Sequence, residues 1–245
     1  MNKTRKKGQV TLFIIIAILI VAAGIAGYFV YQNYQKAQEQ IKMQTFLPVK
    51  QVIDDCFNIS SNDALFISGL QGGYTEPKQF LETNLSKIAY WYYEGRNIQP
   101  SIEDVENEIS SYINIALPLC FSLNAPKTFE LDYDKARTTT TIKENEILFA
   151  VDFPVIAKQQ ELSIKFNKFD TKIDSNFSKI YQIASEIVEN EVSNPDYVPI
   201  SNYTLSNFDI LIMPYDTKTL IYAIVDNSSL IYEQPYILMF ANKFK

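Results

Sequence analysis

The sequence predicts an α+β protein whose N-terminal transmembrane helix continues as a stalk and carries an extracytoplasmic head of helices and an antiparallel sheet. Three observations lead to this fold class. A long uncharged apolar segment follows the N-terminus, apolar residues after position 48 recur at helical spacing, and apolar residues after position 126 alternate as they do in strands. Hydrophobic residues make up 47 % of the 245 residues, and only 7 are glycine and 10 proline, so the chain can bury a core.

The predicted transmembrane helix is the uncharged segment 10–30, which is 21 residues long. At about 1.5 Å per residue it spans roughly 30 Å, which matches the hydrocarbon core of a bilayer. The leader before it, 1–9, contains no acid and four basic residues, namely Lys3, Arg5, Lys6 and Lys7. Because such positive charge stays on the cytoplasmic side, we expect a single-pass membrane protein with a cytoplasmic N-terminus and an extracytoplasmic C-terminal domain.

A polar helical stalk, 31–47, is expected next, because this segment contains good helix formers and neither glycine nor proline. Pro48 then predicts either a break or the first turn of a new helix. The rest of the chain, 48–245, is the predicted extracytoplasmic domain. It divides into a helical part, 48–125, and a β-rich part, 126–245.

Two helices are predicted in the helical part. Apolar residues at helical spacing fill 48–71, and Gly72-Gly73 ends this helix, since glycine suits the position after a helix. Ser101 begins a second helix with a capping-box pattern, and Pro118 is expected to stop it.

The β-rich part is expected to contain two sets of strands and a helix between them. Alternating apolar residues predict an antiparallel meander near 129–133, 147–155 and 162–166. An apolar stripe over 173–192 predicts a helix that covers the buried face of this meander. Three further strands are expected at 210–213, 220–225 and 236–241. The second of these is apolar on both faces, so it should lie inside its sheet.

The junction between leader and helix reads Lys6-Lys7-Gly8-Gln9 and is followed at once by apolar residues. This string resembles the prepilin-type (class III) signal of archaeal type IV pilin-like proteins. The resemblance implies that a prepilin-type peptidase cuts after Gly8, that Gln9 becomes the mature N-terminus, and that the apolar helix stays as anchor and assembly core. It also implies a helical rod followed by a β-rich head.

The resemblance covers about the first 25 residues and departs from the family at one position. Phe13 stands where most members have a glutamate that is thought to aid docking and assembly. An uncleaved signal anchor is therefore the alternative interpretation of the same segment.

The chain contains no histidine, and this absence excludes several kinds of site. Ser–His–Asp and Cys–His arrangements and His-ligated zinc all need an imidazole. We therefore expect the protein not to be an enzyme, and we predict no cofactor and no metal site. The net charge is −6 although the leader is basic, so the exported domain is acidic and should repel nucleic acid.

Cys56 and Cys120 are the only cysteines, and both lie beyond the predicted membrane span. An even count in an oxidising compartment favours one disulfide. This bond would tie the first helix of the head to the end of the second. Two buried free thiols are the alternative.

The densest aromatic stretch is a candidate surface contact and comprises Tyr90, Trp91, Tyr92 and Tyr93. If exposed, these rings could stack on sugars or contact another subunit. The alternative is that they pack over the edge of the domain. Five N-x-[ST] sequons are candidates for N-glycosylation, at Asn58, Asn84, Asn176, Asn202 and Asn227.

These observations together predict a membrane-anchored cell-surface protein, with a pilin-like structural or assembly subunit as the more specific form. The expected partners are the lipid bilayer, copies of the chain or other pilus subunits, and a prepilin-type peptidase. The alternative is a monomeric signal-anchored module that binds carbohydrate or protein outside the cell.

Overall fold

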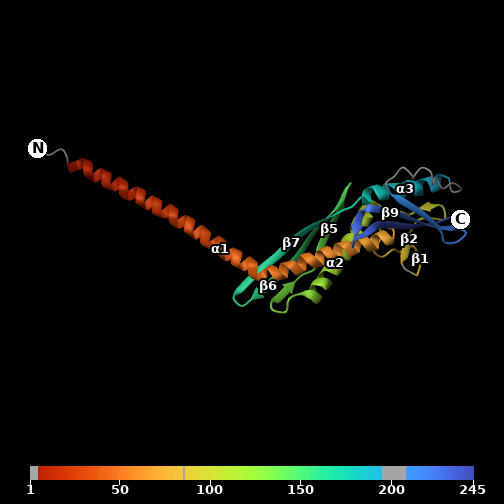
Figure 1. The fold of residues 1–245 in the computed structure, drawn as a ribbon, viewed down its shortest axis with the longest axis horizontal. Coiled ribbons are helices and arrows are strands. Elements are labelled where there is room, and N and C mark those ends of the chain that lie inside the picture. Colours follow the sequence, from red (N-terminus) through yellow and green to blue (C-terminus); the bar gives the residue numbers. More distant parts are fainter. Residues whose placement is uncertain (1–4, 85, 195–207) are drawn as a thin grey trace.

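The structure is a computed structural model, and it describes residues 5–84, 86–194 and 208–245, with side chains from residue 19 onward. Figure 1 shows a long helical rod at one end and a head of helices and two sheets at the other. The α+β class predicted from the change of period is therefore correct, and the sheets are antiparallel apart from one parallel pair of strands.

The rod and the first helix of the head are one helix, α1, which runs from Arg5–Leu70 over 66 residues. The expected break or new helix start at Pro48 is wrong, because α1 continues through this residue. Phe46 and Val49 on either side are fully buried, so packing holds the helix together where proline removes one hydrogen bond. Figure 1 shows that α1 changes direction where it enters the head, and prolines are a usual cause of such bends.

Glycines end α1 as predicted. Gly72 and Gly73 have φ angles of 68° and 90°, in the left-handed region that favours glycine. The Gly73 N–H donates to the carbonyl of Ser68 at 2.7 Å, which satisfies one of the last carbonyls of the helix.

The second helix, α2, covers Ile102–Asn124 and begins as predicted. The Ser101 hydroxyl accepts the Asp104 N–H at 3.1 Å, and the Asp104 carboxylate accepts the Ser101 N–H at 2.9 Å, which is a complete capping box. The expected stop at Pro118 is wrong, since α2 continues for six more residues. Every fourth residue from Val105 to Phe121 of α2 is fully buried, at Val105, Ile109, Ile113, Leu117 and Phe121. Leu117 before the proline and Phe121 after it hold the helix on the core.

The predicted meander forms the first sheet. It contains β4 (Glu130–Tyr133), β5 (Arg137–Ile142), β6 (Glu146–Gln159) and β7 (Leu162–Asp174). All pairings are antiparallel: β5 and β4 pair with successive halves of β6, and β7 pairs with β6 along its length.

The free edge of β5 is covered by α2. Three backbone N–H groups of β5 donate to side chains that lie one helical turn apart on α2. The pairs are Thr138 with Asn114 at 2.6 Å, Thr140 with Ser110 at 3.0 Å and Ile142 with Glu106 at 2.7 Å. An uncovered strand edge is a template for unwanted pairing, so these contacts protect the sheet as well as holding the helix.

The second sheet contains β1 (Phe80–Glu82), β2 (Lys87–Tyr93), β3 (Arg96–Asn97), β8 (Asp209–Pro214), β9 (Thr219–Ile231) and β10 (Gln234–Lys243). Its order is β1-β2-β10-β9-β8, with β3 also paired to β2, and β2 lies parallel to β10. The segment 220–225 lies in β9 between two neighbouring strands, as predicted. The boundary drawn around a helical part, 48–125, is wrong, because β1, β2 and β3 all fall within it.

The third helix, α3 (Phe177–Ser193), forms close to the predicted range but covers a different sheet. Its Phe177 ring packs against Tyr236 of β10, and its Tyr181 ring packs against Trp91 of β2. The expectation that this helix covers the meander is therefore wrong. The meander instead packs against α1 and α2.

A disulfide joins the two long helices of the head, as predicted. The Cys56 and Cys120 sulfur atoms lie 2.06 Å apart, and the two Cα atoms lie 5.6 Å apart. Cys56 is in α1 and Cys120 is near the end of α2. The bond therefore links the base of the rod to the core of the head.

Candidate functional site

The predicted cleavage junction, Gly8–Gln9, lies within the first turns of α1, because this helix begins at Arg5. Their side chains lie outside the described part of the chain, as do the side chains of 10–18 at the start of the predicted span. From residue 19 onward, none of the helices is both long and apolar enough to cross a membrane.

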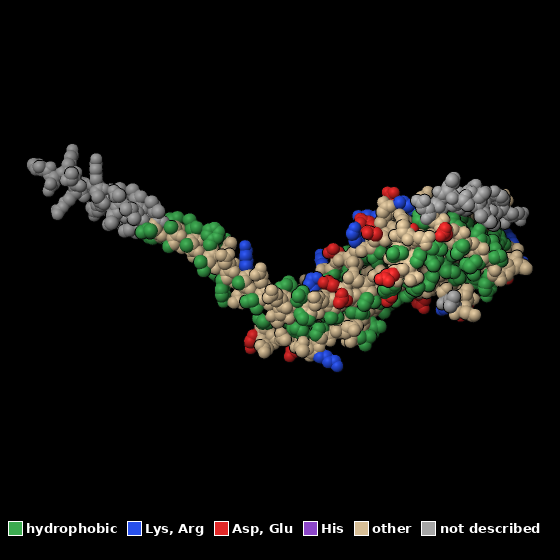
Figure 2. Space-filling model, viewed as in Figure 1, with side chains coloured by type: hydrophobic (Ala, Val, Ile, Leu, Met, Phe, Trp, Pro, Cys, Tyr) green, Lys and Arg blue, Asp and Glu red, His purple; other side chains and the backbone are tan. Residues whose placement is uncertain are grey.

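The described part of the rod exposes an apolar surface. Large hydrophobic side chains that are 53–69 % exposed lie at Leu19, Ile20, Val21, Ile25, Phe29 and Val30. Gly24 and Gly27 have open space where a side chain would stand. Figure 2 shows that hydrophobic side chains gather along this stretch. None of these side chains belongs to the hydrophobic core of the described residues, whereas α1 enters this core from Phe46 onward.

The aromatic stretch named as a candidate surface contact is buried for the most part, which agrees with the alternative that its rings pack within the domain. Trp91 is fully buried, stacks on Phe240 with ring centroids 4.7 Å apart, and donates its indole N–H to the Gly72 carbonyl at 2.9 Å. Tyr90 and Tyr92 are also buried. Only Tyr93 is half-exposed, so the four rings do not form a platform for sugar stacking.

The sequons differ in how free their asparagine amides are. The amide nitrogens of Asn176 and Asn227 donate to the carboxylates of Asp226 and Asp209 at 3.0 and 2.9 Å. The amide oxygen of Asn58 accepts the Thr171 hydroxyl at 2.8 Å. Asn84 is exposed in the turn between β1 and β2, and its amide has no partner among the described residues. Asn202 lies outside the described residues.

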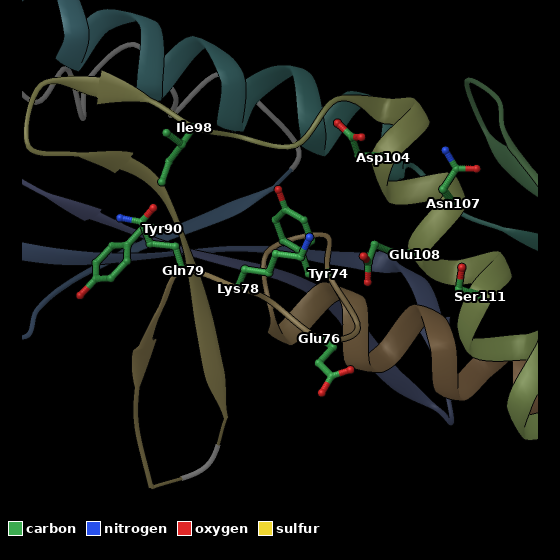
Figure 3. Close-up of a pocket in the computed structure, with 10 residues that line it drawn as sticks. All are labelled: Tyr74, Glu76, Lys78, Gln79, Tyr90, Ile98, Asp104, Asn107, Glu108 and Ser111. Carbon is green, nitrogen blue, oxygen red and sulfur yellow. The ribbon is translucent and has the colours of Figure 1, made fainter.

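A polar cleft of about 430 Å³ lies between α2, the segment that follows α1, and the edge of the second sheet. Figure 3 shows its walls: Asp104, Asn107, Glu108 and Ser111 come from α2, Tyr74, Glu76, Lys78 and Gln79 from the segment after α1, and Tyr90 and Ile98 from the sheet edge. A wider groove continues from it along α2 and shares Glu76, Lys78, Glu108 and Ser111 with it. Beyond these shared residues the groove reaches Ile115 and Leu119.

Two carboxylates fix the shape of the cleft. One Glu108 oxygen accepts both the Thr75 N–H at 3.1 Å and the Thr75 hydroxyl at 2.9 Å, which holds the segment after α1 against α2. Asp104 is held by the Ser101 hydroxyl and N–H, and these hydrogen bonds keep the pKa of its carboxyl below the ordinary value.

The tyrosines of the cleft remain protonated. Burial raises the pKa of Tyr74, and the nearby carboxylates of Asp104 and Glu108 raise it further. Burial also raises the pKa of Tyr90. The cleft therefore offers phenol and amide donors beside carboxylate acceptors, which suits the binding of a polar ligand.

Sequence reasoning missed this cleft, because its residues come from three segments and form no motif. The one signal was the acid-rich start of α2, which the capping box explains by itself. No family model, curated protein or solved structure matches the chain.

Proposed function

We propose that this chain is a membrane-anchored cell-surface protein and, more specifically, a pilin-like structural or assembly subunit. In this proposal residues 10–30 span the membrane, the N-terminus is cytoplasmic and the head is outside the cell. The role of the protein is then to hold the head at the surface or to assemble with other subunits, without a catalytic step.

One observation supports this proposal most strongly: the apolar surface of the rod between Leu19 and Val30. Each of these side chains would gain about 25 cal/mol per Å² on leaving water. The head of the same chain does not cover them, so lipid or neighbouring helices must do so. Both occupants agree with the anchor predicted from the uncharged segment 10–30.

Two further features support an exported head. The Cys56–Cys120 disulfide is of a kind that persists in oxidising compartments and is rare in the cytosol. The continuity of α1 gives a direct helical connection from the apolar segment to the core of the head. A rod followed by a head with a large sheet is also the arrangement that the resemblance to pilin-like proteins implies.

The decisive experiment determines the N-terminal sequence of the protein recovered from membranes. A start at Gln9 that is abolished by Gly8→Val would support the subunit proposal. Gly24→Val is the matched control, since it changes a glycine of the same helix away from the junction and should leave cleavage intact. An intact Met1 or Asn2 in the unaltered protein would contradict processing and leave a simple anchor.

A second candidate function is a monomeric, signal-anchored binding module, and the polar cleft favours it. The aromatic stretch no longer supports sugar binding, but the cleft provides donors and acceptors on several walls. Saturable binding on a glycan or peptide array that is lost in Glu108→Gln, and kept in Glu103→Gln, would support this function. Glu103 is exposed on the same helix and does not line the cleft.

A further inference from the structure

Three tyrosines on the rod each pair with a glutamine one helical turn later. The Gln32 amide donates to the Tyr28 hydroxyl oxygen at 2.6 Å, and the same contact recurs from Gln35 to Tyr31 at 3.1 Å and from Gln38 to Tyr34 at 3.0 Å. All three tyrosine side chains are 60–62 % exposed. Tyr28, Tyr31 and Tyr34 with their glutamines are called the tyrosine collar below.

The direction of these hydrogen bonds decides what the collar can bind. Each phenol oxygen already accepts an amide N–H, so its own O–H remains available as a donor. The collar thus presents three O–H donors at fixed heights along the helix. Two successive tyrosines are three residues apart, which is about 4.5 Å along the helix axis. A suitable ligand offers closely spaced acceptor oxygens and few donors.

The position of the collar narrows the ligand further. Its lower end meets the apolar surface that ends at Val30, and its upper end continues into the polar stalk. Lys36 is exposed within the same stretch, and the first acidic residue of the chain is Glu39. Apolar surface on one side, O–H donors in the middle and the positive charge of Lys36 match an anionic phosphodiester at a membrane surface.

The collar covers only one side of the helix. Successive residues turn by about 100°, so the three tyrosines and their glutamines occupy roughly half of the circumference. Asn33 and Ala37 lie on the opposite side and offer no hydroxyl group. The collar can therefore face lipid headgroups while the opposite side of the same turns faces a neighbouring helix.

We propose that the tyrosine collar binds the phosphodiester headgroups of the bilayer and fixes the depth of the rod in the membrane. The proposal rests on the membrane anchor of the proposed function and adds the class of ligand and the residues that contact it. Phenol O–H groups donate to phosphate oxygens, the glutamines hold the rings in place, and Lys36 adds an attractive charge.

The test uses the full chain in vesicles of phosphatidylcholine and phosphatidylglycerol, with ¹³C in the ζ carbons of tyrosine and phenylalanine. Solid-state NMR then measures dephasing of these ring signals by lipid ³¹P, which reports proximity to phosphate. We expect dephasing in the unaltered chain. The triple variant Tyr28→Phe, Tyr31→Phe, Tyr34→Phe keeps labelled rings at the three positions without their hydroxyl groups, and we expect the dephasing to be lost. The double variant Tyr133→Phe, Tyr215→Phe removes exposed tyrosines of the head and should keep the dephasing.

A second measurement reads the depth of the rod. Both native cysteines are in the disulfide, so a single Asn33→Cys can carry a spin label on the side away from the collar. Loss of three hydroxyl groups should let the label sink toward the bilayer centre by about one helical turn, roughly 5 Å.

The outcomes separate the collar from the anchor. Vesicle flotation tests the anchor alone, and a chain that does not float would overturn the proposed function. A chain that floats but shows equal dephasing and equal label depth in the unaltered protein and the triple variant would overturn the collar and leave the anchor standing.

Discussion

At the scale of single residues, the buried carboxyl group of Glu191 joins α3 to the second sheet. It accepts the Tyr222 hydroxyl of β9 and the Asn242 amide of β10, the latter at 2.5 Å. Asn242 in turn accepts the Tyr92 N–H of β2 at 3.1 Å, so four elements meet at one side-chain network. Burial raises the pKa of Glu191 above its ordinary value of 4.5, and the two hydrogen bonds oppose this rise in part.

The raised pKa predicts how stability changes with pH. The folded state binds the Glu191 proton more tightly than the unfolded state, so this stabilisation is complete below the unfolded pKa and is lost as pH rises through the folded pKa. Glu191→Gln keeps a neutral side chain of the same size and should remove this part of the pH dependence. The free energy of unfolding in urea, measured at several pH values between 4.5, the pKa of the unfolded state, and neutral pH, tests this change. Glu189→Gln, at an exposed position of α3, is the control. If this variant lost the same pH dependence of the unfolding free energy, the assignment to Glu191 would be wrong.

Gly69 lies where α1 packs closely against β10 of the second sheet. A Cβ atom there would lie 2.5 Å from the Ile237 carbonyl oxygen and 3.0 Å from the Tyr236 ring. We expect Gly69→Ala to lower the free energy of unfolding by about 1–3 kcal/mol, because backbone or ring must shift to relieve the clash. Thermal unfolding of the two proteins in detergent measures this loss of stability. Gly27→Ala has open space and should not destabilise the protein.

At the scale of elements, the disulfide is the main covalent constraint on the helices of the head. The cysteines are 64 residues apart, and closing a loop of this length is worth about 4 kcal/mol in the chain-entropy model. The double variant Cys56→Ala, Cys120→Ala should lower the free energy of unfolding by about this amount, measured by urea unfolding without reductant. Reduction of the unaltered protein should give a similar loss, and an unchanged midpoint in both cases would contradict this role.

The contact between α2 and the edge of β5 gives a second prediction for elements. Ser110→Ala removes the acceptor of the Thr140 N–H and leaves a donor unpaired, which costs about 1–3 kcal/mol. Hydrogen exchange at the Thr140 amide should become faster, as measured by NMR. Ser122→Ala lies on the same helix at an exposed position and should leave the Thr140 exchange rate unchanged.

At the scale of the whole molecule, the sequence predicts elements better than it predicts their partners. The alternating period of 147–155 identifies β6, and the apolar stripe of α3 identifies a helix with one buried face. Such a stripe predicts that one face of the helix is buried, but it does not identify the sheet that buries it. The sheet that α3 covers was therefore predicted wrongly. The strand around Trp91 was missed because its buried run of aromatic residues does not alternate with polar ones.

Prolines show a further limit of local rules. Pro48 predicts a break or the start of a new helix and Pro118 predicts the end of a helix, yet both lie inside one. The local cost is one lost hydrogen bond and some distortion, and buried neighbours such as Phe46 and Phe121 outweigh it. The cysteine pair was predictable from its even count and location, whereas the polar cleft depends on three segments that only the fold brings together.

The disulfide also decides how the protein responds to a mechanical load. A pull between the N-terminal end of α1 and the C-terminus enters the head through α1 and reaches Cys56, where the covalent bond passes the tension to Cys120 in α2. The chain between these residues is bypassed and cannot extend while the bond is intact. With a separation of 64 residues, this hidden length is roughly 220 Å at about 3.5 Å per residue. Single-molecule stretching should therefore show a contour length that is longer by this amount in the presence of a reductant.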